Sequence, residues 1–116
     1  VWVVPETQSV ILGDCGPVGW FSDGTAGLAM DAVDQSVSLD MILLPVSPRR
    51  VIVARKPDCT HALDVASLNH ASASASNEFF ISHEANSPQM EALRAAIGTI
   101  TPLATRDEIL ALVMAD

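Results

Sequence analysis

The clearest pattern along the chain is an alternation of apolar and polar side chains that begins at Val37. Positions 37, 39, 41 and 43 are apolar, whereas Ser38 and Asp40 between them are polar, which is typical of a strand with one buried face. From Ile42 onwards both faces are apolar, so we expect the strand at 37–44 to be central in a sheet. The prolines of 45–48 predict a turn, and 50–55 alternates again and predicts the next strand.

Shorter apolar runs predict three further strands. The runs at 1–4 and 9–12 are separated by a turn signal at 5–7, so we expect them to form a hairpin. The aromatic and β-branched run at 78–82 predicts another strand. Between the run at 9–12 and the strand predicted at 37–44, the glycines and aspartates of 18–36 predict a long irregular loop with one helical turn near Met30.

Three segments have helical periodicity. Asp64 is the expected N-cap of a helix over 65–76, and Ser87-Pro88 marks the start of a second helix that Gly98 ends. Thr105 and Glu108 match a capping box and predict a third helix. The expected inward positions are Val65, Leu68, Ser72 and Ala75 in the first helix, Met90, Leu93 and Ile97 in the second, and Ile109, Leu110 and Val113 in the third.

Strands that lead and helices that gather late favour an α+β fold. We predict a single domain over 1–116, with a mainly antiparallel sheet of about five strands and about three helices, two of them C-terminal. The chain opens inside an apolar run without an initiator Met. We therefore expect it to be the C-terminal part of a longer protein, with an upstream domain of that protein as a partner.

Composition narrows the classes of function. The 116 residues include 6 basic and 14 acidic ones, for a net charge of −8, and 49% are hydrophobic. This hydrophobicity excludes a disordered chain, and the acidity argues against a nucleic-acid partner. No apolar run is long enough to predict a membrane span. Two cysteines are too few for a disulfide framework, and nothing resembles a signal peptide, so we expect a cytoplasmic protein.

The turn at 13–17 is the segment with the most candidate chemistry. Asp14 could serve as a general base or metal ligand, and Cys15 as a nucleophile. The alternative is that Asp14 caps its own turn beside a small buried cysteine. The three histidines and two cysteines have no metal-ligand spacing, so we predict no metal site and no cofactor.

Further candidates stand elsewhere in the chain. His83 and Glu84 follow a predicted strand end, where a catalytic pair or a solvated loop pair would both fit. Asn69 lies mid-helix, and if it faces the sheet its amide must be hydrogen-bonded. Arg49 and Arg50 belong to the basic concentration of the chain, with Arg55 and Lys56, and could bind a phosphate or carboxylate or remain solvated. The glycine-rich stretch at 13–27 lacks the spacing of a phosphate-binding loop.

The order of three segments resembles the C-terminal half of a bacterial family of unknown function, domain of unknown function four thousand two hundred and thirty-eight. The segments are 12–18, 43–53 and a helix with Asn69 that runs into 78–82, so the resemblance covers roughly 8–82. This chain has an extra residue between Asp14 and Pro17 and lacks the family's N-terminal helical half. The positions that the resemblance implies as recurring ones are Asp14, Pro17, Pro45, Ser47, Pro48 and Asn69.

Three functions follow as expectations. The first is a scaffold or binding domain of a larger bacterial cytoplasmic protein, with no complete active site in this chain. The second is part of a hydrolase site, with or without a metal, built around Asp14 and Asn69. The third is a small interaction module that dimerises through the exposed edge of its apolar first strand. Whether the chain is an enzyme is left open by its sequence.

Overall fold

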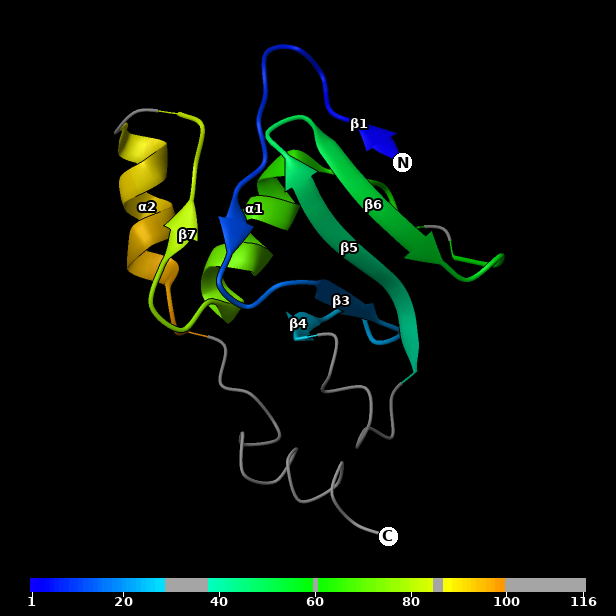
Figure 1. The fold of residues 1–116 in the computed structure, drawn as a ribbon. Coiled ribbons are helices and arrows are strands. Elements are labelled where there is room, and N and C mark those ends of the chain that lie inside the picture. The colour runs from blue at the N-terminus through cyan, green and yellow to red at the C-terminus, as the bar shows by residue number, and fades with distance from the viewer. Residues whose placement is uncertain (29–37, 60, 85–86, 100–116) are drawn as a thin grey trace, which may run out of the picture.

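The computed structural model describes residues 1–28, 38–59, 61–84 and 87–99 (Figure 1). Within them, five antiparallel strands form one sheet in the order β1-β6-β5-β3-β4, and two more strands form a small second sheet, β2-β7. The described residues also form two helices beside these sheets. The fold is therefore α+β with a mainly antiparallel sheet, as expected; the helix predicted after Thr105 lies outside the described residues. The elements are β1 (Trp2–Val3), β2 (Leu12–Gly13), β3 (Val18–Phe21), β4 (Ala26–Leu28), β5 (Leu39–Ser47), β6 (Arg50–Arg55), α1 (Val65–Ala75), β7 (Phe80–Ile81) and α2 (Pro88–Ala96).

The two longest strands form where alternation predicted them. β6 has the predicted bounds. β5 begins at Leu39 and continues through Pro45 to Ser47, so the prediction that the turn starts at Pro45 is wrong. β5 lies between β6 and β3, so the prediction of a central strand is confirmed. The register shifts between Pro45 and Ser47, because a proline cannot donate to the ladder and Val46 is accommodated as an irregularity. The chain then turns at Pro48-Arg49 into β6.

The predicted hairpin of 1–4 with 9–12 is wrong. β1 pairs with β6, with Trp2 opposite Val51, and β2 pairs with β7. The segment between β1 and β2 follows the β5–β6 turn, because Val4 N–H donates to the Arg49 carbonyl at 2.9 Å and Val10 N–H to the Pro48 carbonyl at 2.8 Å. Of the second run, only Leu12 is in a strand, which also includes Gly13.

The predicted irregular loop is also wrong over its described part. β3 and β4 form an antiparallel hairpin, with Gly19 opposite Gly27. Its turn is closed by Asp23, whose carboxylate accepts hydrogen bonds from the backbone N–H and the hydroxyl of Thr25. Gly24 in this turn has φ +87°, a conformation that favours glycine. The helical turn expected near Met30 lies outside the described residues.

Helix α1 begins as predicted. The Asp64 carboxylate accepts hydrogen bonds from the Ser67 N–H at 2.9 Å and the Ser67 hydroxyl at 2.7 Å, which is the geometry of an N-cap. The expected inward residues are buried, and so are all six residues of 71–76. Because those side chains are only Ala and Ser, α1 packs closely against α2, β2, β3 and β4.

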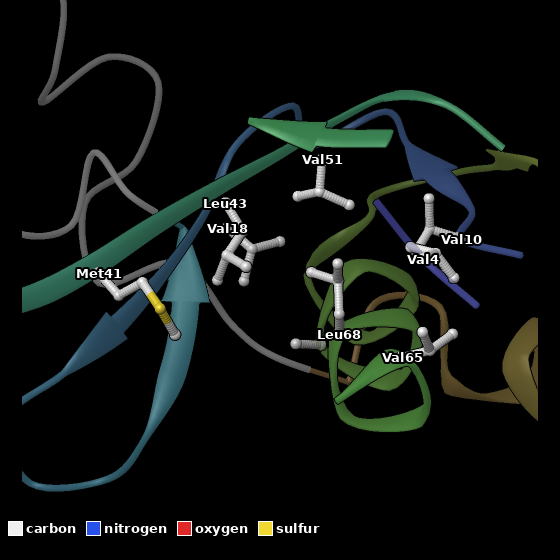
Figure 2. Packing of buried hydrophobic residues seen from close by; sticks show 9 residues of the cluster. Val4, Val10, Val18, Met41, Leu43, Val51, Val65 and Leu68 are labelled. Carbon is white, nitrogen blue, oxygen red and sulfur yellow. The ribbon is translucent and has the colours of Figure 1, made fainter. Parts of the chain in front are cut away.

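The main core lies between α1 and one face of the five-stranded sheet (Figure 2). Val65 and Leu68 of the helix face valines and leucines that the strands contribute, and Val4 and Val10 close the end near the β5–β6 turn. The buried cluster consists of Val4, Val10, Val18, Met41, Leu43, Val51, Val65, Leu68 and Ala71.

Helix α2 packs on α1 and lies on the side of the molecule where β7 runs (Figure 1). The Ser87 hydroxyl accepts a hydrogen bond from Met90 N–H at 3.2 Å, and Pro88 stands at the first helical position. Gly98, with φ +77°, follows the last turn, so both predicted ends are confirmed. Neither described helix is long and apolar enough to cross a membrane.

Candidate ligand-binding cleft

The Asp14 carboxylate clamps the segment that follows α1. Its two oxygens accept hydrogen bonds from three consecutive backbone N–H groups, those of Asn77 at 2.7 Å, Glu78 at 2.9 Å and Phe79 at 3.3 Å. Desolvation raises the pKa of Asp14, but these hydrogen bonds outweigh it and the pKa is lowered from its ordinary value. The carboxylate therefore stays ionised and engaged with backbone. It does not have the geometry of a free general base.

Cys15 and Gly13 pack against the C-terminal end of α1. The Cys15 thiol is half-buried and donates to the Ser72 carbonyl at 3.6 Å, and burial raises the pKa of this thiol. A Cβ at Gly13 would collide with the Ser76 hydroxyl and with the Ser72 carbonyl. The raised pKa of Cys15 disfavours the thiolate, which is the nucleophilic form of a cysteine.

Asn69 faces inward, and both ends of its amide are hydrogen-bonded. Its carbonyl oxygen accepts from Ile11 N–H at 2.9 Å, and its amide nitrogen donates to the Ser9 carbonyl at 3.0 Å. The sequence analysis expected a hydrogen-bonded amide if Asn69 faces the sheet, and this alternative is confirmed. The side chain ties residues 9–11 to α1, while Asp14 ties the loop after α1 to the 13–17 turn. Asp14 and Asn69, the two candidate hydrolase residues, are therefore each hydrogen-bonded to a different backbone segment.

The other candidates meet in one place. Arg49, Arg50 and His83 line a single cleft of about 510 Å³, together with Ser47 and Pro48 of the β5–β6 turn. The cleft is also lined by Val3, Glu6, Thr7, Gln8, Ser9 and Glu84. Three segments far apart in the chain, 3–9, 47–50 and 83–84, supply these residues.

The cleft has charges of both signs on groups that are largely free to bind. Within the described part of the chain, the side chains of Arg50, His83 and Glu6 have no hydrogen bond or ion pair. Arg49 uses one guanidinium donor on the Val4 carbonyl, at 3.3 Å, and its side chain is exposed. The Glu84 carboxylate accepts from the Ser9 hydroxyl at 3.1 Å, which joins the 6–9 segment to the loop after β7.

Two further recesses adjoin the cleft. An apolar one of about 350 Å³ shares Ser47, Pro48 and His83 with it. Another, of about 550 Å³, lies beside α1 and α2 and is lined by Asn69, His70 and Met90 among others. In the described residues no group of three or more His, Cys, Asp or Glu side chains could hold a metal ion.

The sequence interpretation missed Glu6 and Ser9 as site residues. Their signal was present, since Pro5-Glu6-Thr7 marks a polar turn next to a strand.

Comparison of this chain with known protein families, with curated proteins and with solved structures finds no match.

Proposed function

We propose that this chain is a binding domain that holds a small anionic ligand in the cleft, with no complete active site of its own. The observation that carries the proposal is the guanidinium of Arg50, which has no partner among the described residues and lines one cleft with Arg49 and His83. Guanidinium groups recognise carboxylate and phosphate oxygens through charge-assisted hydrogen bonds. The candidate nucleophile and base, Cys15 and Asp14, are engaged in packing and backbone hydrogen bonds.

A thermal-shift titration with citrate and with inorganic phosphate tests the proposal. A ligand that binds the folded state raises the unfolding temperature in a saturable way. We expect such a shift for the natural sequence and for Arg55→Ala, an exposed β6 arginine outside the cleft, and its loss for Arg50→Ala. Equal shifts for all three proteins would mean that the anions act non-specifically, and the proposal would be wrong.

The resemblance to the bacterial family supports a wider proposal, in which the chain is the C-terminal binding domain of a longer cytoplasmic protein. In that arrangement an upstream domain contacts this one. The corresponding test is co-purification of the chain with a separately expressed upstream segment of its gene product. A complex is expected, and its absence at micromolar concentrations would count against the wider proposal.

A second candidate function is self-association through β1. This strand is at the edge of the sheet and pairs with β6 on one side, and the Val3 side chain is 60% exposed. An apolar edge strand is a template for pairing with another chain. Light scattering after size exclusion would show a dimer that Val3→Lys dissociates, whereas a monomer at all concentrations would exclude this function.

A further inference from the structure

We propose that the ligand of the cleft is an apolar amino-acid residue with a free α-carboxylate, either a free amino acid or the C-terminal residue of a peptide. The inference rests on the proposed function and specifies its ligand. It follows from the juxtaposition of three features around Ser47 and His83: a pair of arginines, a pair of glutamates and an apolar recess. An amino-acid residue has three matching groups on one Cα: a carboxylate, an N–H donor and a side chain.

The carboxylate is matched by the arginines of the β5–β6 turn. The Arg50 guanidinium is free of protein partners among the described residues, and Arg49 has spent one donor on the Val4 carbonyl. The turn that supports them is fixed by two backbone hydrogen bonds, from Val4 to Arg49 and from Val10 to Pro48. Guanidinium groups bind a planar carboxylate through paired N–H donors.

The N–H donor is matched by the glutamates. The Glu84 carboxylate accepts from the Ser9 hydroxyl, and the Glu84 N–H donates to the Ser82 hydroxyl at 3.1 Å, so these contacts hold Glu84 itself in place. Glu6 lines the same cleft without a partner in the described chain. These acceptors suit an amide N–H or an ammonium group. Because the glutamates add negative charge beside the arginines, a single carboxylate next to a donor is a better electrostatic match than a ligand with negative charge alone.

The side chain is matched by the adjoining recess. Buried Val10 and Ile11 lie at this recess, and the exposed side chains of Leu12, Val46 and Ile81 surround it. Among the described residues, no Phe or Trp side chain lines either space. Because Ser47, Pro48 and His83 border both spaces, a Cα placed beside them would direct its side chain to one and its carboxylate to the other.

Isothermal titration with four small probes tests the proposal: N-acetyl-leucine, leucine, leucinamide and N-acetylglycine. N-acetyl-leucine represents a C-terminal residue and leucine a free amino acid, so the stronger of the two identifies the source. Leucinamide lacks the carboxylate and should not bind. N-acetylglycine lacks the apolar side chain and should bind at least about tenfold more weakly, given the free energy of burying methylene groups.

Matched variants locate the binding. Arg50→Ala should weaken N-acetyl-leucine about tenfold or more, whereas Arg55→Ala should not. Val46→Ser should weaken N-acetyl-leucine but leave N-acetylglycine unchanged, and Ile52→Ser, an equally exposed position outside the recess, should change neither.

The outcomes separate this inference from the proposed function. If citrate binds in an Arg50-dependent way but neither leucine derivative binds, the inference is wrong and the anion-binding function stands. If N-acetyl-leucine binds no better than N-acetylglycine, the apolar recess plays no part and the inference is likewise wrong. If no probe binds and citrate also fails, both are wrong.

Discussion

The Asp14 carboxylate accepts a hydrogen bond from the backbone N–H of Asn77, 63 residues later in the chain, at 2.7 Å. The reciprocal bond, from Asp14 N–H to the Phe79 carbonyl at 3.1 Å, makes the connection two-sided. This contact fixes the exit of α1 against the end of β2. It also positions β7, and therefore His83 and Glu84, relative to the cleft.

Removing the negative charge of Asp14 should destabilise the protein. In Asp14→Asn, one amide group replaces two acceptor oxygens, so at least one of the three N–H donors loses its partner. We expect a loss of about 1 kcal/mol in the free energy of unfolding, kept small because the site is partly hydrated. Urea denaturation of Asp14→Asn and of Asp58→Asn, an exposed aspartate with the same charge change, measures the difference. Equal stabilities would refute the clamp.

The contribution of Asp14 to the free energy of unfolding should decrease as the pH falls. The pKa of Asp14 is lowered in the folded state, so folding is favoured while the carboxylate is ionised. The stabilisation is present above the ordinary aspartate pKa of about 4 and is lost as the pH falls through the lowered folded value. The stability gap between the natural sequence and Asp14→Asn should therefore close on acidification. A gap that stays constant down to about pH 2 would contradict this assignment.

Replacing Asn69 should lower the free energy of unfolding. Asn69→Ala removes the acceptor of the buried Ile11 N–H and the donor to the Ser9 carbonyl. A cost of about 2 kcal/mol is expected from an unsatisfied buried N–H. Asn77→Ala, in which the exposed side chain is removed but the backbone N–H remains, should cost less than about 0.5 kcal/mol. The prediction fails if the two variants unfold at the same denaturant concentration.

Cys15 should react slowly with thiol reagents. Its half-buried thiol donates to the Ser72 carbonyl, and burial raises its pKa, so little thiolate is present at neutral pH. In a Cys59→Ser protein, alkylation by iodoacetamide reports on Cys15 alone. We expect a rate well below that of free cysteine, which rises with pH and on unfolding in urea. A rate above that of free cysteine would show an activated thiol and revive the nucleophile interpretation.

Features set by a few neighbouring residues were predictable from the sequence. The N-caps at Asp64 and Ser87 and the bounds of β6 depend on side chains within one turn or one strand, and all were found. The β3–β4 hairpin was missed although Asp23-Gly24 is a local turn signal, because the surrounding glycines suggested irregular structure.

Long-range pairing was not predictable in the same way. Apolar runs separated by a short turn normally pair with each other, yet β1 pairs with a strand that begins at Arg50. The composition of the cleft was unpredictable for the same reason. Arg49, Arg50 and His83 were each identified from sequence, but only the folded chain brings them beside Glu6 and Ser9.

The most direct test of the account follows the arginine side chains by NMR during a titration. The Nε–Hε resonances of the ¹⁵N-labelled protein are recorded while succinate is added, and they are assigned with the Arg50→Ala and Arg55→Ala variants. The account predicts that the Arg50 resonance shifts and saturates, with a smaller change at Arg49, while Arg55 stays in place. Shifts of the same size at Arg50 and Arg55, without saturation, would show that the cleft is not a binding site.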